Sequence, residues 1–282
     1  MRWPPYKHVF FDCDSTLTTV EGIDVLAQST GKAWRVEVLT RAAMEGDLDL
    51  ADVYDKRLTA LKPTRAQVNA IRQVYKRNIV ADAASVISAL QDLGHSVYII
   101  SGGLAEPVTE FGLYLGVPRQ NIRAVSIQYD ELSGLWWQKD QFAESKRHYL
   151  NHEASALTIS DGKARIMREM VGDQPGRVLL VGDGLSDLLA GRNADLFTGF
   201  GGVARRERVA SEAPCYITSP SLAPLLALAA GPASLYMLRD PRHSALAAKS
   251  KQLIDTGAMT FNNERLSTKF RQAYQAIHSG TY

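Results

Sequence analysis

Cysteine is scarce in this chain, and long apolar runs are missing from it. Two cysteines, Cys13 and Cys215, are too few for a disulfide framework, so a reducing cytosol is the expected compartment. No stretch reaches the roughly 18–20 apolar residues that span a bilayer, since the most apolar region, residues 222–230, is about half as long and contains Pro224. The opening MRWPPYKH lacks the apolar core of a signal peptide. We therefore expect a cytoplasmic protein that does not engage membranes.

An excess of charge of one sign is also missing. The 32 basic and 30 acidic residues leave a net charge of +2, which gives no indication of a nucleic-acid partner. Hydrophobic residues make up 45% of the chain, which is ordinary for a globular protein. At 282 residues, one domain with a small insert fits better than two full domains. The sequence does not fix the oligomeric state and leaves a homodimer open.

Three short apolar runs end abruptly in polar or glycine-rich turns. They are residues 9–11 before Asp12, residues 97–100 before Ser101-Gly102-Gly103, and residues 178–181 before Gly182-Asp183-Gly184. Helical patterns lie between them, for example at Val86, Ile87, Leu90 and Leu93. This alternation predicts an α/β fold with a doubly wound parallel sheet. The three turns would then share the carboxyl edge of the sheet, where ligands bind in such folds.

Residues 18–78, directly after the first predicted strand, contain little strand pattern. Four apolar stripes occur there at helical spacing: Ile23, Leu26 and Ala27; Val38, Leu39, Ala42 and Ala43; Leu50, Val53, Tyr54, Leu58 and Leu61; and Val68, Ile71 and Val74. An insert at this point would lie over the carboxyl edge of the sheet. We therefore predict an inserted helical-bundle cap at residues 18–78 on an α/β core of residues 1–17 and 79–230.

Two further segments differ from the alternating pattern. Residues 121–137 place Val125, Ile127 and Tyr129 on one face before a Ser133-Gly134 turn, which predicts a β-hairpin. Residues 231–282 form a helical tail of unknown role, with seven Lys/Arg against three acids and a net charge of +4. We interpret these charges as a solvated helix face or a docking arm, in preference to a segment that binds nucleic acid or lipid.

The predicted turns together carry four carboxylates, at Asp12, Asp14, Asp183 and Asp187. An Asp-x-Asp pair by itself is usually a solvated turn. Acids at the end of a buried strand, however, are costly unless a cation or a proton accompanies them. Oxygen ligands without a His or Cys cluster suit Mg²⁺, so the sequence predicts a magnesium site at this edge of the sheet.

The same turns can hold a phosphate. Ser101, with Gly102 and Gly103, offers a hydroxyl and backbone amides that no bulky side chain screens. Lys163, in the first turn of a predicted helix, can add a fixed cation, although a lysine taken alone usually lies on the surface. A phosphoryl group held there needs an in-line nucleophile, and two aspartates at i and i+2 can divide nucleophilic attack from proton transfer.

The order of these motifs resembles a known family. DCDSTLT at 12–18, the SGG turn, Lys163 and GDGLSD at 182–187 are similar to the four motifs of the haloacid dehalogenase superfamily of phosphatases. The similarity extends to the phosphoserine phosphatases of this superfamily. The segments that carry it are VEGIDVLA at 20–27, LTRAAMEG at 39–46, KRL at 56–58, KPTRAQV at 62–68, GFGG at 199–202 and CYIT at 215–218. This resemblance implies a haloacid dehalogenase-like core and a Mg²⁺-dependent phosphomonoesterase. It implies a small phosphorylated metabolite as substrate, with phosphoserine preferred.

The resemblance also implies roles for the matching core residues. Asp12 resembles the nucleophile, Asp14 the general acid and base, and Lys163 the cation that holds phosphate and nucleophile together. Asp183 resembles a Mg²⁺ ligand, joined by the Asp12 side chain and the Asp14 backbone carbonyl, and Asp187 resembles a carboxylate that holds metal-bound water or neighbouring donors. The phosphate and substrate contacts are implied for Ser101, Gly102, Gly103 and Ser186.

In the cap, the resemblance implies the contacts that recognise the substrate. Glu21 resembles the residue that meets an ammonium group, and Arg57 the residue that pairs with a carboxylate. Met44 and Gly46 lie in a segment similar to the substrate-facing turn, and Arg206 matches a basic residue near the site. Taken alone, Glu21 could simply favour a helix N-terminus, and Arg57 could pair with Asp52 or Asp55.

The chain also departs from this family. Leu50 replaces an aromatic residue beside the substrate, residues 142–158 form a longer segment than the family needs, and the tail matches nothing in it. Another small phosphomonoester, or phosphoryl transfer to an alcohol, therefore stays an alternative. A binding module without activity is disfavoured, because Asp12, Asp14, Lys163 and Asp183 are all present.

Overall fold

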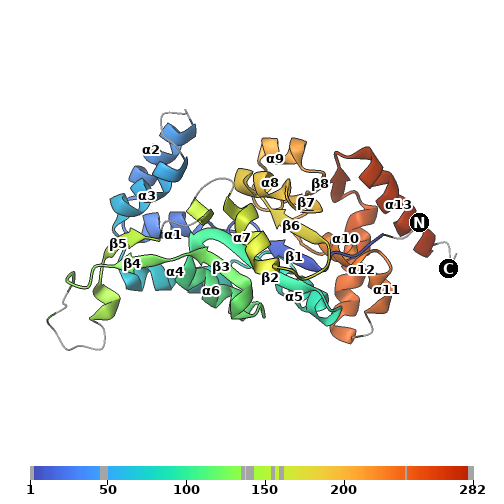
Figure 1. Cartoon of the computed structure of the whole chain (residues 1–282), viewed down its shortest axis with the longest axis horizontal. Helices are drawn as coiled ribbons and strands as arrows, with labels where there is room; N and C mark the ends of the chain where they lie inside the picture. The colour runs from blue at the N-terminus through green and yellow to red at the C-terminus, as the bar shows by residue number, and fades with distance from the viewer. Residues whose placement is uncertain are drawn as a thin grey trace.

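A seven-stranded sheet forms the centre of the molecule (Figure 1). The computed structural model describes residues 3–44, 50–134, 137, 143–153, 156–158, 162–238 and 240–278. The strands follow the order β3-β2-β1-β6-β7-β8-β9, and all neighbours are parallel except β8 and β9. Their bounds are β1 His8–Phe11, β2 Ser96–Leu104, β3 Ile122–Val125, β6 Val178–Gly182, β7 Leu196–Phe200, β8 Cys215–Ile217 and β9 Met259–Phe261.

Helices cover both faces of this sheet. Successive strand residues point to opposite faces, so Val9 and Phe11 belong to one hydrophobic cluster and Phe10 to the other. The first cluster includes α5 (Ala83–Asp92), α6 (Ala105–Tyr114), α10 (Pro224–Ala230) and α12 (Pro241–Asp255). The second includes α7 (Gly162–Val171), α8 (Leu185–Gly191) and α9 (Glu207–Glu212). The predicted doubly wound α/β fold is confirmed.

Strand β1 lies between β2 and β6, and this order positions the predicted turns. Phe11 is level with Ile99 on one side and with Val181 on the other, and Asp12 N donates to the Val181 carbonyl at 2.9 Å. The strands that follow β1 in the chain are added to the sheet on both sides of it, β2 and β3 on one side and β6 to β9 on the other. Such a switch point leaves a crevice outside the carboxyl ends of the strands.

In the described part of the chain, the first four of the five helices that separate β1 from β2 lie at the end of the molecule opposite α13 (Figure 1). They are α1 (Gly22–Ser29), α2 (Ala33–Met44), α3 (Leu50–Leu61) and α4 (Arg65–Arg77). A capping box of Thr64 and Gln67 begins α4, which buries Val68, Ile71 and Tyr75. The sequence predicted Val74 for the last place on this stripe, but Tyr75 lies closer to the face that Val68 and Ile71 define.

The predicted hairpin at 121–137 is wrong in extent. Strand β3 instead pairs with β2 in the main sheet, because Ile122 and Val125 are buried there. Only β4 (Ile127–Tyr129) pairs antiparallel, and its partner is the later strand β5 (Tyr149–His152). Tyr149 N also donates to the Pro63 carbonyl at 2.8 Å, so this small sheet lies against the cap helices. Three short 3-10 helices occupy Arg119–Asn121, Glu144–Lys146 and Ala156–Thr158.

The tail after residue 230 contributes to the main sheet. The sequence predicted only helices here, and the structure has α11 (Ser234–Met237), α12 and α13 (Glu264–His278), with β9 between the last two. Strand β9 pairs antiparallel with β8 at the sheet edge. Phe270 of α13 packs edge-on against Trp3, with ring centroids 5.1 Å apart. The tail thus packs on the core and contacts the start of the chain.

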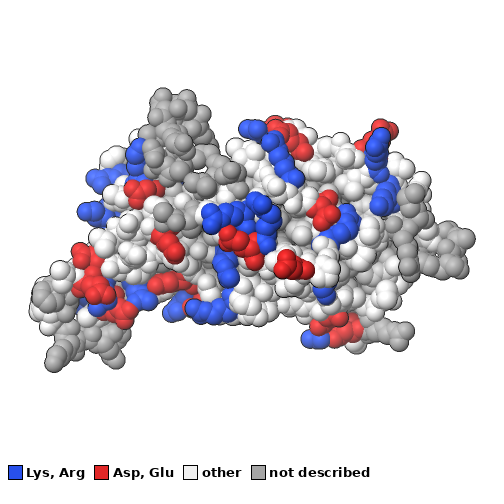
Figure 2. All heavy atoms as spheres, viewed as in Figure 1, with Lys and Arg blue, Asp and Glu red and all other residues white. Residues whose placement is uncertain are grey.

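Charge is mixed over the face shown in Figure 2, where basic and acidic side chains lie beside one another over the centre. Within the described ranges, no helix combines the length and the apolar content that crossing a bilayer would require.

Candidate active site

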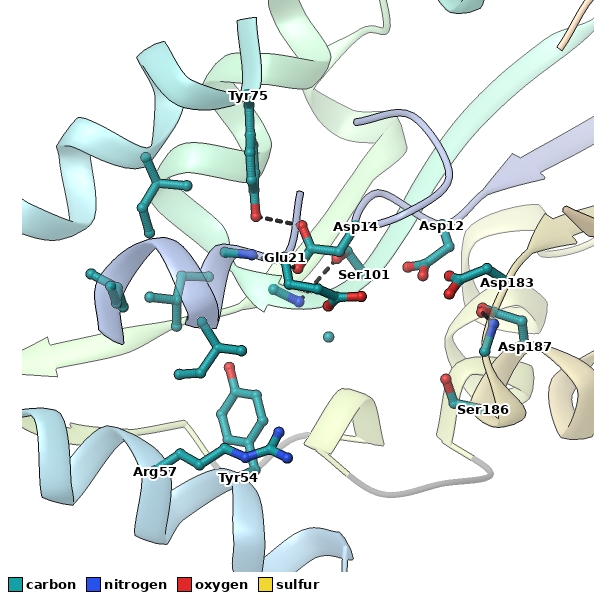
Figure 3. Close-up of a pocket in the computed structure, with 18 of the residues that line it drawn as sticks. Asp12, Asp14, Glu21, Tyr54, Arg57, Tyr75, Ser101, Asp183, Ser186 and Asp187 are labelled. Carbon is teal, nitrogen blue, oxygen red and sulfur yellow. Dashed lines mark hydrogen bonds between the residues drawn. The ribbon is translucent and has the colours of Figure 1, made fainter. Parts of the chain in front are cut away.

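A cavity of about 240 Å³ lies between the carboxyl ends of β1, β2 and β6 and the cap (Figure 3). Most of the site residues predicted from the sequence line this cavity: Asp12, Asp14, Glu21, Arg57, Ser101, Gly102, Gly103, Lys163, Asp183, Ser186, Asp187 and Arg206. Gly46 and the side chain of Met44 lie outside the described residues, as does the side chain of Leu50. The strand ends supply one side of the cavity, and the cap helices supply the other.

Three carboxylates meet on the core side, two that follow β1 and β6 and one in the first turn of α8. One oxygen each from Asp12, Asp183 and Asp187 lies within 4.8 Å of the others, and all three residues are buried. Burial and the charge of Asp12 raise the pKa of Asp183 to about 7 and also raise the pKa of Asp187. Buried acids that repel one another need positive charge nearby. Their oxygen atoms fit a divalent cation of the magnesium or calcium type.

Lys163 supplies part of that positive charge. It begins α7, is 3% exposed, and places Nζ 2.8 Å from Asp12 Oδ1 and 2.7 Å from Asp187 Oδ1. Burial disfavours its charge, but the two carboxylates outweigh burial and raise the pKa of Lys163. The lysine therefore stays protonated beside the carboxylate predicted to be the nucleophile.

Glycine at position 182 allows Asp187 to reach this cluster. A Cβ at Gly182 would lie 2.3 Å from Asp187 Cγ, closer than any side chain could tolerate. Asp187 Oδ2 accepts a hydrogen bond from Gly184 N at 3.1 Å, which ties the carboxylate to the first turn of α8. The glycines of the GDGLSD segment thus leave space for a buried acid.

The end of β2 supplies the predicted phosphate contacts. Ser101 is buried, and its Oγ accepts a hydrogen bond from Gly103 N at 2.9 Å. A Cβ at Gly102 would come no closer than 3.7 Å to Leu157 O, so the glycine is not required by crowding. Two adjacent glycines instead leave backbone open to an anion in the cavity.

Asp14 points toward the cap rather than toward the acid cluster (Figure 3). Its Oδ1 accepts a hydrogen bond from Tyr75 Oη at 2.5 Å, and its Oδ2 accepts one from Gly22 N at 3.3 Å. Burial, followed by the charge of Glu21, raises the pKa of Asp14 to about 8. This carboxyl group therefore carries a proton at neutral pH and can act as an acid.

Glu21 and Arg206 connect the two sides of the cavity. Glu21 is the N-cap residue of α1 but makes no capping hydrogen bond there. Its Oε1 instead accepts from Ser15 Oγ at 2.7 Å and lies 3.2 Å from Arg206 Nη2. Arg206, which is 45% exposed, places Nε 2.8 Å from Asp183 Oδ2. The alternative in which Glu21 merely stabilises a helix end is therefore not what the structure has.

Arg57 lies across the cavity from the acid cluster, on α3 (Figure 3). Burial is the main influence on its guanidinium and lowers the pKa of Arg57, while the charges of Asp24 and Glu21 oppose that shift. Asp55, suggested as a partner from the sequence, contacts Tyr149 and His152 instead. Arg57 and Glu21 thus place one positive and one negative group on the cap side.

Sequence reasoning missed several cap residues that line the cavity, chiefly Tyr54 and Tyr75 among the apolar Ile23, Leu26, Leu58 and Ile71. The Tyr54 hydroxyl is buried and has no hydrogen-bond partner in the part of the chain that is described. Both tyrosines fall on or beside helical stripes that the sequence assigned to packing. Their spacing places them on inward faces, but it does not show that those faces border a cavity.

Comparison with known proteins agrees with the motif order. A family model for haloacid dehalogenase-like hydrolases matches residues 6–195. The phosphoserine phosphatase of Mus musculus is 30% identical over 217 residues, which cover 74% of this chain and 88% of that protein. The phosphoserine phosphatase of Drosophila melanogaster is 33% identical over 213 residues, covering 74% of each chain.

A solved structure agrees at the level of the fold. A phospho-aspartyl intermediate analogue of phosphoserine phosphatase superimposes with a TM-score of 0.62 at 25% identity. The match covers 79% of this chain and 98% of that one. The part of the chain without a counterpart is therefore about a fifth of its length.

Proposed function

Because this chain belongs to the haloacid dehalogenase-like hydrolase family and is a phosphoric monoester hydrolase, we propose that it hydrolyses O-phosphoserine to serine and phosphate. One observation carries the choice of substrate. The cavity joins a phosphate-binding side to a cap side that bears one acid, Glu21, and one base, Arg57. A small phosphate ester that carries both an ammonium and a carboxylate group complements this arrangement.

In the first step, Asp12 attacks phosphorus. A new bond forms between a carboxylate oxygen and phosphorus, while the ester P–O bond breaks and leaves its electron pair on the serine oxygen. Asp14 transfers its proton to that oxygen, so serine leaves as a neutral alcohol. Lys163, 2.8 Å from Asp12 Oδ1, orients the nucleophile and offsets negative charge on the phosphoryl group.

In the second step, water hydrolyses the aspartyl-phosphate. Asp14, now a carboxylate, takes a proton from the water as its oxygen bonds to phosphorus. The bond between phosphorus and the Asp12 oxygen breaks, which regenerates the Asp12 carboxylate and releases phosphate. Ser101, with the backbone at Gly102 and Gly103, binds the phosphoryl oxygens in both steps.

The buried acids would hold the cofactor that the family implies. Asp12, Asp183 and the backbone carbonyl of Asp14 would bind Mg²⁺, and Asp187 would hold neighbouring donors and water. When bound, the ion neutralises phosphoryl charge and assists in-line geometry. The three buried carboxylates within 4.8 Å of one another support this assignment, because they otherwise repel at neutral pH.

The same proposal places the enzyme in the cytoplasm and, through its serine product, in amino-acid biosynthesis. A small phosphorylated metabolite is its partner. Two free, buried cysteines are consistent with a reducing compartment. The arrangement of subunits stays a prediction.

A panel of substrates tests the proposal. Purified protein is assayed for phosphate release, with and without Mg²⁺, from phosphoserine, phosphothreonine, phosphoethanolamine, glycerol phosphate and an aryl phosphate. We expect kcat/KM for phosphoserine to exceed that for the phosphates that lack the ammonium or the carboxylate by about tenfold or more, since loss of one buried charge contact costs at least that much. The Asp12→Asn variant is the control for contaminating phosphatases. A higher kcat/KM for a phosphate that lacks the ammonium or the carboxylate would contradict the substrate assignment.

A further inference from the structure

We propose that Tyr75 is a positioning residue for the general acid: its hydroxyl occupies Oδ1 of Asp14, which leaves Oδ2 as the oxygen that delivers the proton to the leaving group. The inference rests on the proposed function, in which Asp14 is the acid. It assigns a role to a cap residue that sequence analysis did not identify.

The two oxygens of Asp14 are held unequally. Tyr75 Oη donates to Oδ1 at 2.5 Å, whereas Gly22 N reaches Oδ2 only at 3.3 Å. A short hydrogen bond from a phenol requires an acceptor, so Oδ1 serves as the carbonyl-like oxygen of the protonated acid. The Tyr75 phenol is the donor in this bond, and Asp14 Oδ1 is the acceptor. The mobile proton of Asp14 belongs on Oδ2.

The ring of Tyr75 has little freedom to leave this position. The side chain is 0% exposed and meets Phe111 of α6 edge-on, with ring centroids 5.4 Å apart. Ion pairs connect α4 to the same core helix on either side of Tyr75, between Arg72 and Glu110 at 2.6 Å and between Lys76 and Glu110 at 2.7 Å. Tyr75 thus belongs to the part of the cap that packs on the core and pairs with it.

Glycine at position 22 makes room for the contact. A Cβ at Gly22 would lie 2.4 Å from Tyr75 Oη, so an alanine there would displace the hydroxyl. Gly22 is the first residue of α1, where alanine is intrinsically the better helix former. The chain therefore has a residue at this position that suits the tyrosine contact better than it suits the helix.

The chemistry of the leaving group separates this role from simple packing. The serine alkoxide is a poor leaving group and needs a proton from Asp14, whereas 4-nitrophenolate departs readily without one. Because kcat/KM reports the steps up to departure of the first product, it measures proton donation and excludes hydrolysis of the phosphoenzyme. A misplaced acid should slow the hydrolysis of phosphate esters of alcohols and leave the hydrolysis of activated aryl phosphates nearly unchanged.

The experiment compares Tyr75→Phe, Gly22→Ala and Asp14→Asn with the wild-type protein. For each, kcat/KM is measured for phosphoserine and for aryl phosphates whose leaving groups span a range of pKa values. We expect Tyr75→Phe and Gly22→Ala to lower kcat/KM for phosphoserine by about 10- to 100-fold and for 4-nitrophenyl phosphate by less than about threefold. The dependence of kcat/KM on leaving-group pKa should steepen in both variants, as it should more strongly in Asp14→Asn.

Tyr149→Phe is the matched control. It removes another phenol that donates to a carboxylate, Asp55 Oδ1 at 3.2 Å, from a residue that does not line the cavity. We expect it to leave the leaving-group dependence unchanged. Thermal unfolding of every variant identifies any that fails to fold, and Gly22→Ala then carries the test if Tyr75→Phe is unstable.

Two results would overturn the inference, and they can be told apart. If Asp14→Asn steepens the leaving-group dependence while Tyr75→Phe and Gly22→Ala do not, Tyr75 has no positioning role and the proposed mechanism stands. Equal losses for both substrate classes in these two variants would likewise show a structural role only. If Asp14→Asn itself loses both classes equally, the assignment of the acid is wrong and the inference falls with it.

Discussion

The two sides of the cavity are built in different ways. The phosphate side consists of Asp12 and Asp183, each the first residue after a parallel strand, Ser101 near the end of β2, and Lys163 in the first turn of α7. The cap side consists of Glu21, Arg57 and two tyrosines, which reach the cavity from the faces of helices. Position along a strand fixes the first group, whereas helix packing fixes the second. We therefore expect the phosphate side to govern the reaction and the cap side to govern substrate specificity.

The two sides also differ in how their charges are arranged. On the phosphate side, Lys163 and Arg206 lie within 2.8 Å of the carboxylates, so the charges are compensated inside the protein. On the cap side, Glu21 lies 3.2 Å from Arg206, and Arg57 lies across the cavity from the acid cluster (Figure 3). Changes on the phosphate side should therefore affect every substrate, and changes on the cap side should affect only substrates that carry matching charges.

The largest effect is expected at Asp12. Asp12→Asn removes the proposed nucleophile, so kcat/KM should fall about 10⁴-fold or more, roughly 5 kcal/mol of transition-state stabilisation, for all phosphate esters alike. Steady-state assays on phosphoserine and an aryl phosphate measure it. Retained turnover of either ester would show that the two sides do not divide as described.

Removal of divalent metal comes next. Chelation should reduce activity toward every ester by about three orders of magnitude, because a Lewis acid at the phosphoryl group contributes several kcal/mol. Added Mg²⁺ should restore the rate, and Ca²⁺ should restore it poorly because its coordination is looser. Rates that are unaffected by exhaustive chelation would show that the reaction does not depend on a divalent metal at the phosphate side.

The cap side should show selective losses. Arg57→Ala and Glu21→Gln each remove a proposed charge contact with phosphoserine, and loss of such a contact typically costs about 2–5 kcal/mol. Hydrolysis of an aryl phosphate, whose uncharged aryl group makes neither contact, should change by less than about threefold. Measuring both esters with each variant controls for damage to the fold. Proportional losses for the two esters would contradict the division between reaction and specificity.

The pH profile sharpens the comparison, because Asp14 lies where the two sides meet. The pKa of Asp14 is raised to about 8, first by burial and then by the charge of Glu21. The acid must be protonated, so kcat/KM for phosphoserine should be level below this pH and fall about tenfold per unit above it. In Glu21→Gln the repulsion is gone, and the alkaline limb should move to lower pH. An unmoved limb would show that Glu21 does not influence the acid.

The smallest effect on catalysis is expected far from both sides. Phe270→Ala in the tail empties a site against Trp3 and should destabilise the fold by about 3–5 kcal/mol. Denaturant unfolding measures this loss. At temperatures where the variant is folded, kcat/KM should equal that of the wild type. A selective loss of phosphoserine activity would instead connect the tail to the cap side.

The cap shows why sequence reasoning reached some residues and not others. Residues at strand ends can be predicted from the sequence because each keeps a fixed offset from an apolar run. Asp12 and Asp183 were predicted as site residues in this way, and both line the cavity. On a helix, neighbouring positions share nearly the same face, and Val74 was chosen for a stripe that Tyr75 completes. An apolar stripe does not show whether a buried residue packs against other side chains or borders a cavity. For that reason the sequence assigned Tyr54 to the packed face of its helix.

The sequence by itself determined the alternation of strands and helices, and it predicted the inserted cap and the acids, glycines and lysine that line the phosphate side of the cavity. These follow from local periodicity and from the cost of burying charge at a strand end. Only the tertiary structure decided that β3 joins the main sheet, that β9 closes its other edge, and that Tyr75 bonds Asp14. Each of these depends on surfaces distant along the chain, and their complementarity is not encoded in any short segment.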